Sequence, residues 1–157
     1  LATAAEHQRE QGRALSLYYR GAILNRLARY PEALASLDQA LAERSDLVLA
    51  REERGESLWQ LGRRQEAVSA WQDAVGRNPG LVLANNLLAG AAALSGRPEA
   101  AIAHEASADR NTPANPFFHW VIGLRLQGVG MGGLAEKHFR RAIDLDPGFR
   151  SARTDRQ

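Results

Sequence analysis

Cysteine is absent from the 157-residue sequence, which excludes disulfide bonds and thiolate metal ligands within it. The same absence leaves the redox compartment, and with it the cellular location, unassigned. No run approaches the ~20 apolar residues that a membrane-spanning helix needs, and no signal-peptide pattern is visible. The first residue is Leu1 rather than methionine, from which we expect a fragment or a processed product of a longer protein.

Neither sign of charge dominates the sequence. Twenty basic residues face eighteen acidic ones, which gives a formal net charge of +2, and the two kinds are interspersed. Nucleic-acid binding requires a basic stripe or patch, so we predict no nucleic-acid partner. Aromatic residues are also few, at 6%, whereas alanine and leucine are abundant. Because alanine, leucine, arginine and glutamate lose little entropy in helices, this composition predicts a helical fold.

Internal repeats account for nearly the whole chain. Four sets of residues recur at steps of 34 with no insertion or deletion. The sets are Ala33, Ala67, Ala101 and Ala135; Ala40, Ala74, Ala108 and Ala142; Gly21, Gly55, Ala89 and Gly123; and Ser45, Pro79, Pro113 and Pro147. Each unit contains two stretches with apolar or small residues at helical intervals, such as EALASLDQAL. A short turn separates the two stretches and a loop follows them, so each unit is predicted to be a helical hairpin.

Small residues recur where the two helices of a unit are expected to cross. Gly21, Gly55 and Gly123 fall inside the predicted first helices, where glycine costs roughly 1 kcal/mol relative to alanine. Their recurrence predicts a close approach of the two backbones, which offsets this cost. Pro31 and Pro98 fall at the start of second helices, where a missing N–H is harmless.

This pattern resembles the tetratricopeptide repeat, a 34-residue helical hairpin with small residues in both helices, a bulky residue in the second and a late proline. The bulky positions hold Leu37, Trp71 and Phe139, and the resemblance covers residues 14–149. It implies an all-α, right-handed superhelical solenoid of antiparallel helix hairpins. Glu105 replaces an apolar residue in the third unit, so the packing of that unit is expected to depart most from the family.

The repeat register divides the chain into six segments. We predict a partial helix of a preceding repeat over residues 1–13, four repeats over 14–47, 48–81, 82–115 and 116–149, and a capping or continuing helix over 150–157. Capped ends are expected because each unit of a repeat array buries its face only against its neighbours.

A glycine-rich stretch, GVGMGG at residues 128–133, matches the G-x-G-x-x-G pattern of dinucleotide-binding sites. Such a site needs a strand before the glycines and a helix after them. Here a predicted helix precedes the glycines, and the aligned stretches of the other units are short turns. We therefore predict an inter-helix turn at this place and no nucleotide cofactor.

No catalytic or metal-binding constellation is visible in the sequence. The four histidines are His7, His104, His119 and His138, and none belongs to an H-E-x-x-H pattern. His104 and His138 lie one repeat apart, but neighbouring helix axes at ~8–10 Å are too far apart for both side chains to share one zinc ion. We therefore expect exposed, ordinary histidines, no metal or other cofactor, and no enzyme within these residues.

In the family that the sequence resembles, the first helices line a concave groove. Carried over by register, this implies that the candidate partner-binding residues are Tyr18, Tyr19, Asn25, Arg26, Glu52, Glu53, Glu56, Trp59, Gln60, Asn86 and Trp120. Aromatic side chains beside charged ones are typical of protein-binding hot spots. Packing between repeats is the alternative role for Trp59 and Trp120, whereas Trp71 is assigned to the core.

Three glutamates of this set, Glu52, Glu53 and Glu56, share one helical face because they are spaced three and four residues apart. Two interpretations stay open: an ordinary solvated face, or an acidic patch that pairs with basic residues of a partner. The clamp for a terminal carboxylate that chaperone-binding members of the family use is absent, since Leu83 and Leu87 stand at two of its positions.

The sequence thus predicts a protein-interaction scaffold whose groove binds a segment of another protein, extended or helical, with basic and apolar residues. Two alternatives stay open. The chain is an accessory domain of a larger enzyme or of a secretion or assembly complex, or it is a scaffold that self-assembles end to end into homo-oligomers. The encoded full-length protein distinguishes the first alternative, and light scattering across a concentration series distinguishes the second.

Overall fold

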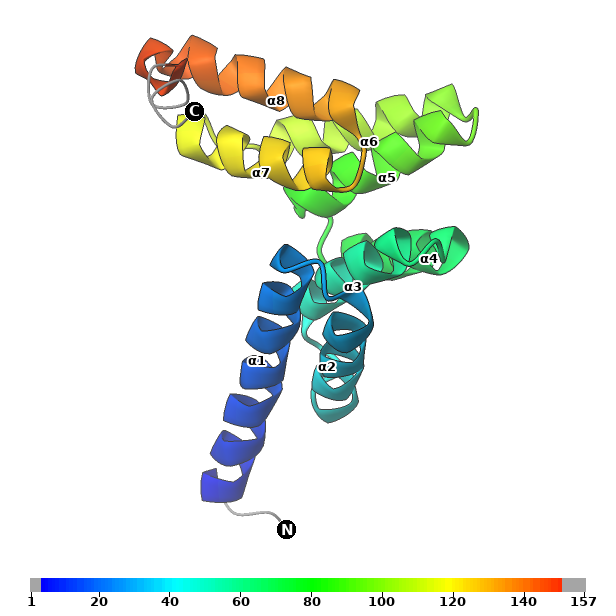
Figure 1. Ribbon diagram of the computed structural model, residues 1–157, viewed down its shortest axis with the longest axis vertical. Coiled ribbons are helices and arrows are strands. Elements are labelled where there is room, and N and C mark those ends of the chain that lie inside the picture. The colour runs from blue at the N-terminus through cyan, green and yellow to red at the C-terminus, as the bar shows by residue number, and fades with distance from the viewer. Residues whose placement is uncertain (1–3, 151–157) are drawn as a thin grey trace. The chain divides into compact units, whose positions relative to one another are not determined.

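The computed structural model describes residues 4–150, with side chains described for residues 12–148. Within these residues the secondary structure is entirely helical, with eight α-helices, one short 3-10 helix and no strand. The elements are α1 (Ala4–Arg26), α2 (Tyr30–Glu43), α3 (Val48–Gln60), α4 (Arg64–Arg77), α5 (Val82–Leu94), α6 (Pro98–Asn111), α7 (Pro116–Gly128), α8 (Gly132–Leu145) and η1 (Pro147–Arg150), shown in Figure 1. The prediction of an all-α fold is confirmed.

The helices recur at a step of 34 residues. The second helices of the hairpins begin at Tyr30, Arg64, Pro98 and Gly132, and they end at Glu43, Arg77, Asn111 and Leu145. The first helices α3, α5 and α7 begin at Val48, Val82 and Pro116. Consecutive members of each series differ by 34, so the hairpin borders do not drift through the described part of the chain.

Helix α1 differs from the other first helices in its length. It runs without interruption for 23 residues, whereas α3, α5 and α7 each have 13. Residues 1–13 are predicted to belong to a separate preceding helix, but residues 4–13 instead continue α1. That stretch is rich in good helix formers and has no proline, and a single glycine, Gly12, does not suffice to end a helix. Of the predicted capping segment 150–157, residues 151–157 lie outside the described residues.

The chain forms two compact units, Leu1–Pro79 and Gly80–Gln157. In the first unit α1 packs against α2 and α3 against α4, and α2 also contacts α3; in the second unit α5 packs against α6 and α7 against α8 (Figure 1). Helices joined by such short turns run antiparallel, so each pair is a helical hairpin. The recurring alanines lie at the helix contacts, where Ala40, Ala74 and Ala142 are fully buried.

The two helices of a hairpin pack closely where a small residue on the first helix faces a bulky residue on the second. A Cβ atom added to Gly21 would lie 2.5 Å from Leu37 Cγ, and one added to Gly123 would lie 2.5 Å from Phe139 Cε1. Both distances are far below ordinary van der Waals contact, so only glycine allows the bulky side chain to lie directly against the backbone of the first helix.

The third hairpin lacks the bulky residue and also lacks the glycine. Glu105 stands at the position equivalent to Leu37, and Ala89 at the position equivalent to Gly21. Ala89 is buried, at 1% exposure. A methyl group therefore fits in the one hairpin where no large side chain needs the space, which shows that the two positions compensate each other.

Replacing Gly55 by alanine is expected to lower the free energy of unfolding by about 1–2 kcal/mol, because the added methyl group would overlap the Trp71 indole. The gain in helix propensity, about 1 kcal/mol, offsets only part of the overlap. Gly76 in α4 is the matched control, since an added Cβ there meets no atom within 4 Å, and Gly76→Ala should stabilise by about 0.5–1 kcal/mol. Urea denaturation measures both changes, and equal stabilisation by the two variants would contradict the close packing.

The GVGMGG stretch contains the turn between α7 and α8: Gly128 ends α7, and Gly132 begins α8. Gly130 has a left-handed φ of 82°, and its equivalents one and two repeats earlier, Gly96 and Gly62, have φ values of 67° and 78°. Ala28 holds the same position in the first hairpin, with φ 57°. Glycine adopts this conformation without the steric penalty of a side chain. Because helices flank the stretch on both sides, the prediction of an inter-helix turn is confirmed.

Candidate functional site

Predicted partner-binding residues at the end of α1 form a polar cluster with α3. Arg26 Nη2 donates to Glu53 Oε1 over 2.9 Å, and Asn25 Nδ2 donates to the Glu53 carbonyl oxygen over 2.9 Å. Ser57 Oγ donates to Asn25 Oδ1 over 2.7 Å. Asn25 and Glu53 are buried, whereas the Arg26 side chain is 45% exposed. These contacts join α1 to α3 within the first unit.

The three glutamates of α3 are buried. Glu52, Glu53 and Glu56 are 6%, 3% and 6% exposed, so the expectation that their carboxylates face solvent is wrong. The physical reason is that Arg26 reaches over from α1, pairs with Glu53 and approaches Glu56 to 3.9 Å. Removing one partner of a buried ion pair is strongly destabilising. Charge reversal of these glutamates is therefore expected to disturb the fold, and it does not isolate a role in binding.

The predicted aromatic residues divide between the surface and the core. Tyr19 is 60% exposed, and its ring centroid lies 4.9 Å from that of half-buried Tyr18. Trp59 is buried, with its ring centroid 5.4 Å from that of Trp71. The Arg64 guanidinium lies over the Trp59 ring at 3.8 Å from the centroid, in a cation–π contact. Trp59 thus packs inside the first unit, and Tyr19 presents aromatic surface to solvent.

The remaining predicted residues also differ in exposure. Asn86 is 1% exposed, and its Nδ2 donates to the Val82 carbonyl oxygen of its own helix over 2.9 Å. Gln60 and Trp120 are half-buried. The Trp120 ring centroid lies 5.0 Å from that of Phe139, which anchors α7 on α8. The predicted set is therefore not one continuous exposed surface.

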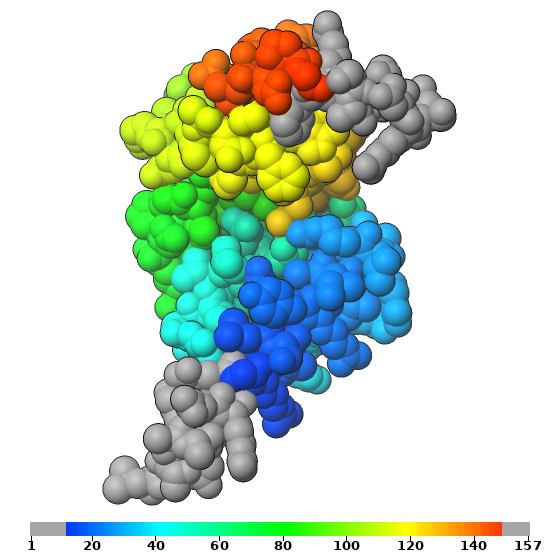
Figure 2. Space-filling model, turned by 90° about the vertical axis from the view of Figure 1, so that its left-hand side faces the viewer, coloured from blue at the N-terminus to red at the C-terminus, as the bar shows by residue number. Residues whose placement is uncertain are grey.

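Helix α7 carries an exposed apolar row that the predicted set does not contain. Phe117, Val121 and Leu124 are 65%, 36% and 48% exposed, and their spacing of four and three residues places them on one helical face. The surface of α7, yellow in Figure 2, lies open in that view. Ile122 and Leu126 of the same helix are buried. In the sequence this row is indicated by a second apolar face on the helix, because a helix needs only one apolar face to pack against its neighbours.

Helix α1 and the turn after it carry a similar row in the first unit. Leu15, Tyr19, Ile23 and Leu27 recur every four residues; Leu15 is 37% exposed and each of the other three is 60% exposed. Only Tyr19 belongs to the predicted set. Contiguous exposed apolar side chains are uncommon on proteins that bind nothing, and they mark interaction surfaces.

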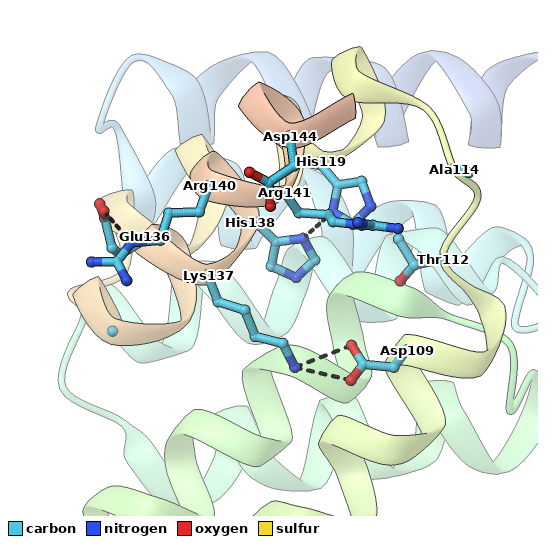
Figure 3. Close-up of a pocket in the computed structure, with 11 residues that line it drawn as sticks. Asp109, Thr112, Ala114, His119, Glu136, Lys137, His138, Arg140, Arg141 and Asp144 are labelled. Carbon is cyan, nitrogen blue, oxygen red and sulfur yellow. Dashed lines mark hydrogen bonds and ion pairs between the residues drawn. The ribbon is translucent and has the colours of Figure 1, made fainter. Parts of the chain in front are cut away.

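A cavity of about 770 Å³ lies in the second unit, between the end of α6, the start of α7 and one face of α8 (Figure 3). Two histidines line it, and their Nδ1 atoms are 3.0 Å apart. His119 and His138 are only 8% and 2% exposed, so the prediction of exposed histidines is wrong for this pair. Both side chains are buried because they lie on the facing sides of α7 and α8 within one hairpin, 19 residues apart.

The same two hairpin positions carry a polar pair one repeat earlier. Asn85 Oδ1 and His104 Nδ1 lie 3.3 Å apart, and they too are separated by 19 residues. The signal that could have found both pairs is this separation, which marks residues that meet across a hairpin. His104 on α6 and His138 on α8, which are one repeat apart, belong to neighbouring hairpins instead.

The histidine pair is electrically neutral near neutral pH. Burial lowers the pKa of His138 to about 4, and His119 adds to the shift. Burial likewise lowers the pKa of His119, with a further contribution from Arg141. Burial opposes the charge of Lys137, but the contacts of its Nζ with Asp109, at 2.9 Å, and with Glu105, at 3.3 Å, together outweigh burial and raise the pKa of the ammonium group.

Candidate metal clusters and candidate membrane-spanning helices are both absent from the part of the chain that the structure describes. No group there of three or more His, Asp or Glu side chains could hold a metal ion. None of the helices between residues 4 and 150 combines the length and the apolar character needed to cross a membrane.

Comparison with models of protein families gives a match over much of the chain. A tetratricopeptide-repeat family model matches residues 21–74 and 52–116, which together span more than half of the sequence. The chain belongs to the tetratricopeptide-repeat family. As a tetratricopeptide-repeat protein it is, in general terms, a protein-interaction scaffold. Comparison with curated proteins gives no match.

Solved structures share the tetratricopeptide-repeat fold of this chain. The crystal structure of MamA has 20% identity and a TM-score of 0.61, with 88% of this chain and 81% of that chain covered. TTC0263, a thermophilic TPR protein of Thermus thermophilus, has 24% identity and a TM-score of 0.64, with coverage of 85% and 75%. MamA 41-end from Desulfovibrio magneticus RS-1 has 22% identity and a TM-score of 0.58, with coverage of 86% and 76%. At these identities the likeness concerns the fold alone.

Proposed function

We propose that this tetratricopeptide-repeat protein binds a segment of another protein against the two exposed apolar rows of its first helices, the row on α1 with the turn after it and the row on α7. The observation that carries the proposal is the row formed by Phe117, Val121 and Leu124 on α7. Full burial of one such side chain contributes about 1.5–3 kcal/mol. Covering three side chains that are already partly exposed on one helix therefore supplies a substantial driving force for association.

The row on α7 is fixed in place before any partner binds. Gly123, on the same helix, lies directly against the Phe139 ring, and Trp120 packs against that ring from α7. Asn115 Oδ1 accepts a hydrogen bond from the Phe118 N–H and caps the start of the helix. Anchors that are held in this way lose little conformational entropy on binding, which favours affinity.

In the first unit, the corresponding surface is the row on α1 and the turn that follows it. Tyr19, Ile23 and Leu27 each expose 60% of their surface, and half-exposed Arg26 lies beside them. Buried members of the predicted set in the first unit support this face from within the fold in our proposal. These are Asn25, Glu52, Glu53, Glu56 and Trp59.

The chemistry of the partner follows from what the two rows offer. Both rows are apolar, and the carboxylates of Glu53 and Glu56 already have Arg26 beside them. The predicted partner segment therefore binds chiefly through apolar side chains, and basic residues contribute orientation more than affinity. No covalent chemistry is involved in this role.

A double variant, Phe117→Ser with Leu124→Ser, is expected to weaken partner binding by at least about tenfold, because it removes the two most exposed apolar side chains of the row on α7. Partners are first captured from an extract of the source organism and identified by mass spectrometry. Their affinity for the purified variants is then measured by calorimetry. Both residues are exposed, so the helicity of the double variant should equal that of the wild type.

The matched control is Leu94→Ser with Ile102→Ser. These residues are 70% and 67% exposed and lie outside both rows, so the control removes a similar amount of exposed apolar surface. It is expected to leave the affinity unchanged within about twofold. Equal loss of binding in the two double variants, or full binding by the first, would contradict the proposal.

A further inference from the structure

The Nε2 atom of His138 is buried in the cavity between α6 and α8, and it has no hydrogen-bond partner among the described residues. The whole side chain is only 2% exposed. Figure 3 shows this nitrogen turned away from His119, toward the space beside the Lys137–Asp109 ion pair. A buried polar atom of this kind normally has a partner, and where the protein supplies none, a bound molecule is the expected one.

The contact between the two histidines determines what the buried nitrogen offers. Two Nδ1 atoms at 3.0 Å share one hydrogen, which one ring donates and the other accepts. If His119 donates, its own Nε2 carries a lone pair, and His138 keeps its hydrogen on Nε2. The neighbouring Arg141 cation, which opposes protonation of His119, favours this tautomer. His138 then presents an N–H donor to the cavity.

A cationic donor faces the same space. Arg141 lines the cavity, and no ion pair joins it to another of the residues that the structure describes. Asp109 lies across the cavity and shares Lys137 with Glu105, and the Asp144 carboxylate lines the cavity as well. Arg140 also lines the cavity, but its Nε donates to Glu136 over 2.9 Å. The donors available to a bound molecule are therefore those of Arg141 and His138.

We propose that this cavity binds an oxyanion, the carboxylate or phosphate group of a small ligand, between the Arg141 guanidinium and Nε2–H of His138. Guanidinium binds such groups through paired, charge-assisted hydrogen bonds. The site goes beyond the partner surface, because it is built by α6 and α8 around the His119–His138 pair and includes neither exposed row. Carboxylate and phosphate ligands share this chemistry, and separate probes distinguish them.

Binding is coupled to protonation of the histidines. The charged and titratable groups that act on the pair are Asp109 from α6 and Lys137 and Arg141 from α8, with His119 itself on α7. A bound anion adds a negative charge beside them and favours the uptake of a proton by the pair. Because the pKa of His138 lies at about 4 without the anion, the affinity for the anion is expected to rise as the pH falls from about 6.5 to about 5.

The test is an NMR titration of the imidazole nitrogens in the full chain, with inorganic phosphate and acetate as separate probes. We expect the His138 Nε2 resonance to shift to saturation with at least one probe, and at lower concentration at the lower pH. Arg141→Gln should weaken this binding by about tenfold or more. Arg140→Gln, which removes a cation already paired with Glu136 from the same cavity, should change it by less than about twofold.

Saturation by phosphate alone identifies a phosphate-type ligand, and saturation by acetate alone identifies a carboxylate; both results support the proposal. Absence of a saturable His138 shift with either probe overturns it. Equal weakening by the two arginine variants also overturns it, because that result shows a general effect of charge. Since Arg141 is exposed, its replacement should leave the helicity intact. If Arg141→Gln loses helicity, the titration of the wild-type chain alone tests the proposal.

Discussion

Replacing Trp71 by alanine is expected to lower the free energy of unfolding by about 3–5 kcal/mol. Trp71 has no exposed surface, its Nε1 donates to the Glu52 carbonyl oxygen over 3.2 Å, and its ring packs on Trp59 and directly against Gly55. Alanine leaves a cavity the size of an indole between α3 and α4. The backbone of α3 cannot close it without breaking the hairpin contact.

Urea denaturation followed by circular dichroism measures this change. Trp71→Phe should cost less, about 1–2 kcal/mol, because it keeps an aromatic ring and loses one hydrogen bond and part of the volume. Leu94→Ala, at a residue that is 70% exposed, should change stability by less than about 0.5 kcal/mol. A loss below about 1 kcal/mol for Trp71→Ala would show that the small-and-bulky contact does not hold the hairpin together.

Acidification from pH 7 to pH 5 is expected to lower the free energy of unfolding by about 2 kcal/mol through His138 alone. The pKa of His138 is about 4 in the folded chain, below the ordinary value of 6.5. Between these values the unfolded chain binds more protons than the folded chain, so stability is full above pH 6.5 and decreases as the pH falls toward 4. The lowered pKa of His119 acts in the same direction.

Denaturation of the wild type and of His138→Gln at the two pH values measures this dependence. Each protein is compared with itself, so a general loss of stability in the variant cancels. The difference between pH 7 and pH 5 should shrink by more than half in His138→Gln. Carboxyl groups ionise mostly below this window. An unchanged difference would mean that the folded chain accommodates a protonated His138.

The repeating backbone could be predicted from the sequence because the close helix contacts and the left-handed turns each require a particular type of residue. Glycine at positions 21, 55 and 123 is needed where a bulky side chain meets the first helix, and a 34-residue step keeps these contacts in register. The left-handed turn residues Gly62, Gly96 and Gly130 follow the same step. These constraints are local to each hairpin, and a single sequence displays them directly.

The candidate site could be predicted only in part, because exposure depends on which neighbour covers a residue. Glu53 lies on the expected first-helix face, but Arg26 from the preceding first helix covers it. His119 and His138 meet because α7 and α8 pack with one register; the 34-residue step does not give this pairing, and only the 19-residue separation indicates it. The sequence places Val121 on a first helix, but its exposure depends on how α7 packs against its neighbours.

In the proposed function a partner lies on the two exposed apolar rows, the row on α1 with the turn after it and the row on α7. Methyl NMR of the chain, with and without a purified partner, tests it most directly. The methyl signals of Val121, Leu124 and Ile23 should shift on binding, while those of Ile102 and Leu94, which lie outside the two rows, should stay in place. Shifts confined to Ile102 and Leu94, with the two rows unchanged, would contradict it.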